Sequence, residues 1–209
     1  MNMRRVRQCL LALTVLLSFA PLVCGEDTES EAKENKDFAS PDGRFAFRFS
    51  GKAEDENRTF DLIDKHSKKK LLRIAKEDAD IGPSSRFAME VLWRPDSKAF
   101  AVTETLWKRG SGVEVYLLDG STFRKVKMPK LEADITDKMK GGKEFDHVVE
   151  ISSQSPTEWR KDGSLVVEIE SIQDGQGGTI TVNRTVILTF RGGKAMILKS
   201  DTEFKIENQ

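Results

Sequence analysis

Side chains that commonly bind metal ions or act in catalysis are few in this sequence of 209 residues. Of the two histidines, His66 lies among four lysines in the segment 65–70, and His147 follows an aspartate. The lysines repel a divalent cation at His66. Neither histidine has a second histidine four residues away, the spacing that forms a zinc-binding helix face. We therefore expect both to occupy ordinary turn or strand-edge positions.

The sequence motifs of nucleophilic, phosphate-binding and calcium-binding sites are also missing. No G-x-S-x-G or D-x-D-x-D-G pattern occurs, so neither a nucleophile elbow nor a calcium loop is predicted. The glycine-rich segment 174–178 lacks the Lys-Ser/Thr pair that follows in a phosphate-binding loop. Two carboxylates suffice for glycoside hydrolysis, and 34 acidic residues meet that requirement without identifying a site. The sequence therefore predicts no catalytic residue, no metal ligand and no cofactor.

The first 25 residues have the composition of an export signal. Arg4, Arg5 and Arg7 precede an apolar run over 9–20, and a region of small residues ends at Gly25. The run is shorter than the roughly 20 apolar residues that a membrane span needs. We therefore predict a signal peptide over 1–25, an exported protein that is periplasmic or secreted, and no transmembrane segment in the mature chain.

Both cysteines of the chain, Cys9 and Cys24, lie in this leader. The mature chain then has no thiol for a disulfide, a nucleophile or a zinc site. Cys24 is a candidate for lipid attachment, because a cysteine after an apolar run is the modified residue of bacterial lipoproteins. The residues before it, Pro21-Leu22-Val23, depart from the pattern of such sites, so a lipid anchor is disfavoured.

Charge is balanced over the whole chain, with 34 basic and 34 acidic residues. Removal of the leader takes away three arginines and leaves a mildly acidic chain, which argues against a protein held by the phosphates of nucleic acid. The segment 26–36 has no apolar residue larger than alanine and cannot offset the entropy of ordering. We predict a flexible tether over 26–37 and a single β-rich domain over 38–207.

Alternation of apolar and polar residues, the pattern of half-buried strands, recurs through this domain. Glycine-containing turns at 119–121, 174–178 and 191–193 separate several of the alternating segments. The predicted strands lie at 45–49, 58–63, 70–75, 86–93, 98–106, 113–117, 122–127, 148–153, 165–169, 179–190 and 194–206.

One segment breaks the alternation. Leu131, Ile135 and Met139 recur every four residues, and two glycines follow at 141 and 142. This spacing places the three apolar side chains on one face of a helix, and glycines commonly end helices. The sequence therefore predicts one short amphipathic helix over 130–140.

A short repeat is the most specific feature of the sequence. In two copies a tryptophan, a charged residue and an Asp-Ser or Asp-Gly turn precede an apolar strand, and a third copy lacks the tryptophan. Aspartate side chains accept backbone N–H bonds in such turns. Recurrence of the tryptophan at one position favours packing between sheets over binding of a sugar. The repeat residues are Asp42 and Gly43; Trp93, Asp96 and Ser97; and Trp159, Asp162 and Gly163.

These copies resemble the W-S-P-D-G-K units of TolB-type and related WD-like β-propellers, whose blades are four-stranded sheets. The resemblance implies a mainly β fold in which about three blade-like units form a propeller-like stack of antiparallel sheets. The turns lie 54 and 66 residues apart, whereas blades have about 40–50 residues and closed propellers about four to eight blades. We therefore expect a stack that is not closed, with a β-sandwich as the alternative.

Trp107 lies outside the repeat, beside Lys108 and Arg109 and before a Gly-Ser-Gly turn, which makes these three residues the candidate recognition surface. An open stack leaves sheet edges that a partner can cover. The sequence thus predicts an exported, non-catalytic protein-interaction module of the bacterial cell envelope, which binds another protein or a second copy. The alternative is a small exported hydrolase or carbohydrate-active protein with carboxylates in a cleft between sheets.

Overall fold

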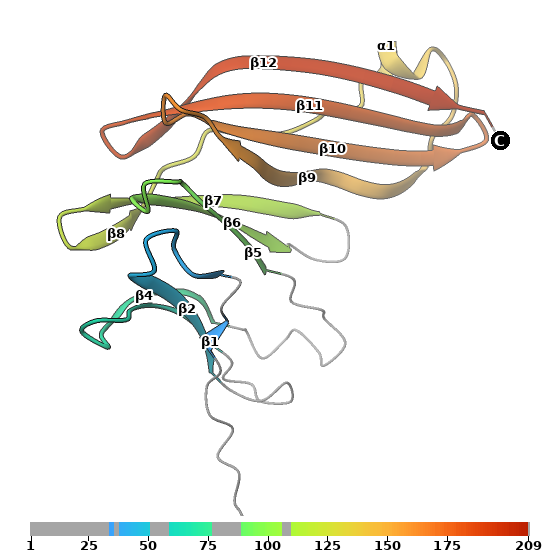
Figure 1. The fold of residues 1–209 in the computed structure, drawn as a ribbon. Coiled ribbons are helices and arrows are strands. Elements are labelled where there is room, and N and C mark those ends of the chain that lie inside the picture. Colours follow the sequence, from blue (N-terminus) through green and yellow to red (C-terminus); the bar gives the residue numbers. More distant parts are fainter. Residues whose placement is uncertain (1–33, 36–37, 51–58, 77–88, 106–109, 209) are drawn as a thin grey trace, which may run out of the picture. The chain divides into compact units, whose positions relative to one another are not determined.

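The computed structural model describes residues 34–35, 38–50, 59–76, 89–105 and 110–208 of the chain. Ala32–Gln209 forms one compact unit. The prediction of a mainly β chain is confirmed: the described residues form three four-stranded antiparallel sheets, none of them closed, and one helix of four residues (Figure 1).

Each sheet is a meander, in which every strand lies beside the strand that precedes it in the chain. Antiparallel neighbours need only short hairpin connections, which the predicted turns supply. The first sheet contains β1 (Glu34–Asn35), β2 (Phe45–Ser50), β3 (Thr59–Asp64) and β4 (Lys70–Lys76); the second contains β5 (Met89–Trp93), β6 (Ala99–Thr105), β7 (Ser111–Asp119) and β8 (Thr122–Lys125); the third contains β9 (His147–Trp159), β10 (Leu165–Gly175), β11 (Gly178–Arg191) and β12 (Lys194–Glu207).

An aromatic core lies between the first and second sheets. It contains Phe45, Phe47 and Phe60 from the first sheet and Phe100 and Phe123 from the second, and none of them is more than 3% exposed. Phe47 stacks on Phe60 with 4.7 Å between ring centroids and meets Phe100 edge-on at 5.3 Å. Aromatic pairs of this kind add about 0.5–1.5 kcal/mol each beyond the burial of their area.

An aliphatic core lies between the second and third sheets. Its members include Ala101 and Val115 from the second sheet and Leu165, Val167 and Leu188 from the third. Along β6, neighbouring residues point alternately into this core and into the aromatic one. The second sheet is therefore buried on both faces between the other two, which explains its continuous apolar segment at 99–102.

The helix α1 (Asp137–Lys140) is shorter than predicted. Thr136 caps its start, and Gly141 ends it with a φ of 59°. The prediction of a helix is wrong for 130–136, because Leu131 and Ala133 alternate into the aliphatic core and backbone groups of this segment bond to strand side chains instead of to each other. These bonds join the Leu131 carbonyl to Gln154, the Glu132 carbonyl to Arg184, and the Ala133 N–H to Ser152.

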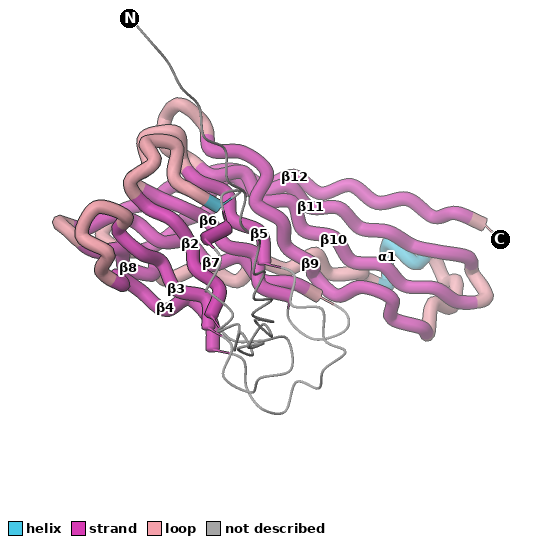
Figure 2. Tube along the Cα trace, turned by 60° about the horizontal axis from the view of Figure 1, so that its bottom comes forward, coloured by secondary structure: helices cyan, strands magenta, loops and turns pink. Residues whose placement is uncertain are grey.

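Each predicted strand overlaps an observed one, and several observed strands extend beyond their predicted ends, β10 to Gly175 for example. The strand β1 was not predicted, and β9 extends to Trp159 although its second half is polar and contains Pro156. Proline is tolerated there because β9 is an edge strand, and Pro156 lies beside a shift in register. Figure 2 shows the long strands of the third sheet, with α1 near the end at which β10 and β12 finish. In the described part of the chain the only helix, α1, is far too short to span a bilayer.

Candidate functional site

The three copies of the repeat form the same turn, and each turn joins the first two strands of a sheet. In every copy an aspartate Oδ1 accepts a hydrogen bond of 3.0 Å from the backbone N–H two residues later. The residue after the aspartate has a positive φ, 72° at Gly43, 59° at Ser97 and 80° at Gly163, in the region that favours glycine. The aspartates are Asp42, Asp96 and Asp162.

The two tryptophans of the repeat make equivalent hydrogen bonds to the preceding sheet. Trp93 Nε1 donates to the carbonyl of Phe38 at 3.0 Å, and Trp159 Nε1 donates to the carbonyl of Leu92 at 3.0 Å. In the repeat alignment both acceptors stand immediately before the tryptophan position, which Ala39 fills in the first copy. Each tryptophan therefore fastens its own turn to the turn of the sheet before it, a packing role rather than a ligand platform.

Further contacts join the turns of neighbouring sheets. The backbone N–H of Asp42 donates to Ser97 Oγ at 3.0 Å, which binds the turn of the first sheet to that of the second. The Arg94 guanidinium lies over the Trp159 ring, 5.7 Å from its centroid, and its Nε is 2.8 Å from Asp96 Oδ1. The repeat turns of the three sheets are therefore physically connected.

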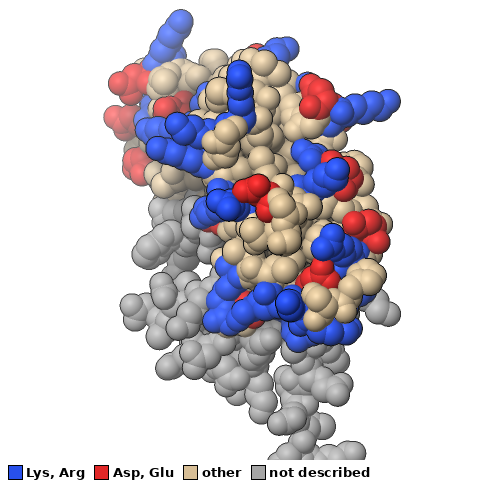
Figure 3. All heavy atoms as spheres, turned by 90° about the vertical axis from the view of Figure 1, so that its left-hand side faces the viewer, with Lys and Arg blue, Asp and Glu red and all other residues tan. Residues whose placement is uncertain are grey.

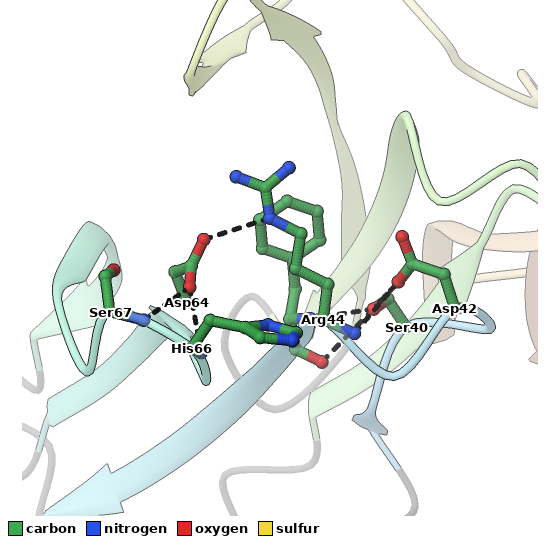
Figure 4. A network of polar contacts seen from close by, with 7 residues as sticks. Ser40, Asp42, Arg44, Asp64, His66 and Ser67 are labelled. Carbon is green, nitrogen blue, oxygen red and sulfur yellow. Dashed lines mark hydrogen bonds and ion pairs between the residues drawn. The ribbon is translucent and has the colours of Figure 1, made fainter.

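The first sheet's turns carry a network of polar contacts (Figure 4). The Asp64 carboxylate accepts bonds from the backbone N–H groups of Ser67 at 2.9 Å and His66 at 3.0 Å, and from Arg44 Nε at 3.0 Å. The Ser67 N–H and then Arg44 lower the pKa of Asp64 to about 2. A general acid at neutral pH needs an upward shift instead. This network therefore stabilises the β3–β4 turn and ties it to Arg44, and His66 contributes its backbone.

The glycine-rich segment 174–178 is the tip of the β10–β11 hairpin, and close packing explains its composition. A Cβ on Gly175 would overlap the carbonyl oxygen of Glu144, and one on Gly178 would overlap that of Glu207. A Cβ on Gly177 would lie 2.8 Å from that of Lys143. The glycines thus permit the loop after α1 and the C-terminal segment to approach the hairpin.

A depression of about 410 Å³ lies beside this hairpin tip. Its lining comes from 142–144, from 176–178 and from Asn208, whose Oδ1 accepts a hydrogen bond from Lys143 Nζ at 2.8 Å. One carboxylate, that of Glu144, borders it. In the described residues the two cores fill the spaces between sheets, and no three His, Cys, Asp or Glu side chains gather to hold a metal ion.

The outer face of the third sheet, which points away from the aliphatic core, is polar. Register places Glu168 opposite Thr185 and Glu170 opposite Asn183 on this face. Glu168, Glu170 and Thr185 are exposed. The outer face therefore differs from the apolar inner face and does not need a further sheet to cover it.

The edge strand β12 is the most exposed apolar element of the described structure. Met196 is 46% exposed, Leu198 63% and Phe204 50%. Leu198 is the extra residue at a register shift between β11 and β12. Lys127 pairs with the start of β12 at Lys194, and beyond Ala195 no described strand covers its outer edge. Sequence reasoning did not single out this edge, although three consecutive apolar residues at 196–198 interrupt the alternation there.

The opposite edge of the same sheet is partly occupied. Ser111 Oγ, at the start of β7, donates to the carbonyl of Gln154 and accepts from its N–H, each at 2.9 Å. On β9, Val149 is 37% exposed and Ile151 58%. The β9 edge of the third sheet therefore already has backbone groups bonded to the second sheet, whereas the β12 edge is free.

Several predicted residues lie outside the described part of the chain. They are Cys24 and the candidate recognition surface Trp107, Lys108 and Arg109. His147 is exposed at the start of β9, opposite Asp174 in the register. These placements leave the edge of β12 as the candidate binding surface in the described structure.

No protein-family model matches the chain, and comparison with curated proteins gives no match either.

Proposed function

We propose that this protein is an exported, non-catalytic protein-interaction module of the bacterial cell envelope, which binds a partner along the free edge of β12. The observation that carries the proposal is this edge, open from Met196 to Glu207 and rich in exposed apolar side chains. A partner strand added there would bond to the unpaired backbone groups, and its apolar side chains would pack against those of β12.

The charge pattern of β12 suits a specific partner better than general aggregation. The polar residues Lys199, Asp201, Glu203 and Lys205 pair with outer-face residues of β11, so charges of both signs flank the apolar positions. Charged edge residues and a bulge at Leu198 discourage pairing with arbitrary strands. The edge therefore selects a strand whose charges complement this order.

We also propose that the three sheets are propeller-like blades in an arc that stays open. Two features support this proposal: every sheet is a four-stranded meander with the repeat turn between its first two strands, and Trp93 and Trp159 make the same bond to the preceding sheet. A sandwich of two sheets would not produce an equivalent bond at each successive sheet. The export and envelope location rest on the leader sequence.

The test is co-purification of residues 26–209 from an envelope fraction, with matched variants. The edge variant carries Leu198→Ser and Phe204→Ser, and the control carries Val149→Ser and Ile151→Ser, which are exposed apolar residues on the opposite edge. We expect one stoichiometric protein to be captured by the wild type and the control and lost from the edge variant. Amide exchange of β12 should slow in the complex.

Two results would overturn the proposal. One is a monomeric chain that captures no stoichiometric protein. The other is a partner that the edge variant retains while circular dichroism shows both variants folded. Turnover of a glycan or ester by the wild type, abolished by a single Asp or Glu substitution, would instead establish the hydrolase alternative.

A further inference from the structure

The meander topology places six hairpin turns at one end of the three sheets. In an antiparallel meander the turns after the first and third strands lie at the same end, and bonds between the repeat turns bring the three sheets' ends together. We call this end the hairpin rim. Its segments are the six turns together with adjoining strand residues, which for the β7–β8 turn include all of β8: 42–44, 64–70, 94–98, 119–125, 160–164 and 191–194.

The hairpin rim carries a large surplus of positive charge. Its segments contain thirteen Lys or Arg residues and five Asp residues, although the whole chain is neutral. Figure 3 faces this side of the molecule and shows Lys and Arg side chains spread over it, with the fewer acidic groups between them. The surplus of eight charges on one face must be balanced by acidic residues elsewhere, so the protein is strongly polarised.

Several of these cations have no acidic partner. Within the described part of the chain, no carboxylate lies within ion-pair distance of Lys68, Lys69, Lys161, Arg191 or Lys194, and all five are exposed. They come from the turns of the first and third sheets. Charges that already have partners contribute less to binding an external anion, so cations without an ion pair, such as these five, are the ones most available to bind it.

Acidic residues of the rim bind groups of the turns themselves and so stabilise the turns. Asp64 accepts two backbone N–H bonds and one bond from Arg44. Asp162 Oδ1 accepts from the backbone N–H of Ser164 at 3.0 Å and from its hydroxyl at 2.6 Å. The cations are thus displayed on turns that are already fixed, which reduces the entropy lost on binding.

The chemistry of the rim distinguishes between kinds of anionic partner. Its one aromatic residue, Phe123, is 3% exposed, so the rim has no platform for stacking the bases of single-stranded nucleic acid. Eight of the thirteen cations are lysines, and lysine is depleted at protein–protein interfaces, where aromatic residues and arginine are enriched. Many lysines spread over several turns match a partner whose surface carries many separate phosphate groups.

We propose that the hairpin rim docks on an anionic lipid bilayer through lipid phosphates. Each Lys or Arg near such a surface adds to binding, and the attraction is screened by salt over a Debye length of about 10 Å at 0.1 M. This docking is independent of the partner proposed for β12, because it uses the turns and not the strand edge.

The experiment measures co-sedimentation of residues 26–209 with vesicles of phosphatidylcholine containing phosphatidylglycerol. The fragment includes both hydrophobic cores and lacks the basic leader. The rim variant carries Lys68→Gln, Lys69→Gln, Lys161→Gln and Lys194→Gln. We expect it to bind on the order of 1000-fold more weakly than the wild type, because each of the four lysines contributes about 1 kcal/mol near an anionic surface, and wild-type binding to fall as salt rises.

A control variant with the same change in net charge carries Lys138→Gln, Lys140→Gln, Lys199→Gln and Lys205→Gln, from α1 and β12. It should bind almost as well as the wild type. Equal losses in the two variants would overturn the proposal, because overall charge would then suffice. Equal binding to pure phosphatidylcholine vesicles would also overturn it, as would binding to duplex DNA or to an acidic protein with no binding to anionic vesicles at low salt.

Discussion

Replacing Trp159 by phenylalanine removes one hydrogen bond between two sheets while keeping an aromatic ring in place. The indole N–H donates to the Leu92 carbonyl at 3.0 Å, and the Trp159 side chain is 7% exposed. An unsatisfied buried carbonyl costs about 1–3 kcal/mol. The smaller ring also loses contact with Phe190, 5.5 Å away between centroids, and with Arg94, which adds about 1 kcal/mol. We expect a total of about 2–4 kcal/mol.

The assay is urea unfolding of residues 26–209, followed by far-ultraviolet circular dichroism. A lower midpoint with an unchanged m-value would report a loss of stability without a change in the surface exposed on unfolding. Trp93→Phe is the matched control, because it removes the equivalent bond to Phe38. Trp93 is only half-buried, so its carbonyl partner is more easily hydrated and the expected cost is smaller, about 1–2 kcal/mol.

Exchange of the indole protons provides a measurement that needs no mutation. Both N–H groups should exchange more slowly than a free indole, and that of Trp159 should be the slower of the two. A cost below about 0.5 kcal/mol for Trp159→Phe, together with indole exchange as fast as in a free peptide, would refute the role of the tryptophans as links between sheets.

Three further comparisons test the turns and the glycine-rich hairpin by urea unfolding. Ser97→Ala and Ser97→Gly both remove the hydroxyl that accepts from the Asp42 N–H, but only alanine is strained at the φ of 59°, so Ser97→Ala should be about 1 kcal/mol less stable than Ser97→Gly, and equal stabilities would contradict this account. Asp64 has a pKa of about 2, below its unfolded value of about 3.9, so its advantage over Asp64→Asn should be complete above about pH 4 and disappear toward pH 2, whereas a constant difference would contradict it. Gly178→Ala should cost about 3 kcal/mol or more, because the added Cβ overlaps backbone, and Gly192→Ala, which has nothing within 4 Å, about 1 kcal/mol; similar costs would be inconsistent with this packing.

The strands could be predicted from the sequence because local alternation decides them. Phe45, Phe47 and their neighbours alternate, and these residues form a strand with one face in the aromatic core. The helix over 130–140 could not be predicted correctly, because Leu131 lies at once in an i+4 series and in a period-2 series with Ala133. Bonds to Gln154 and Ser152, far away in the sequence, decide between the two patterns.

The hairpin rim could not be predicted either, because its charges are distributed through the chain. The lysines at 68–70 read alone indicate a solvated turn, and pairs such as Arg160-Lys161 are unremarkable by themselves. Only the meander brings alternate turns to the same end, and only the bonds between turns bring three sheets together. A neutral sequence therefore encodes a polarised protein through the order of its turns.

The third sheet also changes the reason for expecting a partner. Three repeat units are fewer than a closed propeller contains, and this shortage by itself would require a partner to cover an apolar end face. The outer face carries exposed Glu168, Glu170 and Thr185, so water can cover it without a large loss of free energy. Among the edges of the described sheets, that of β12 combines unpaired backbone groups with the open Leu198 and Phe204 side chains. A partner that stacks on the face would gain little, whereas a partner that extends the sheet would satisfy both the backbone and the apolar side chains.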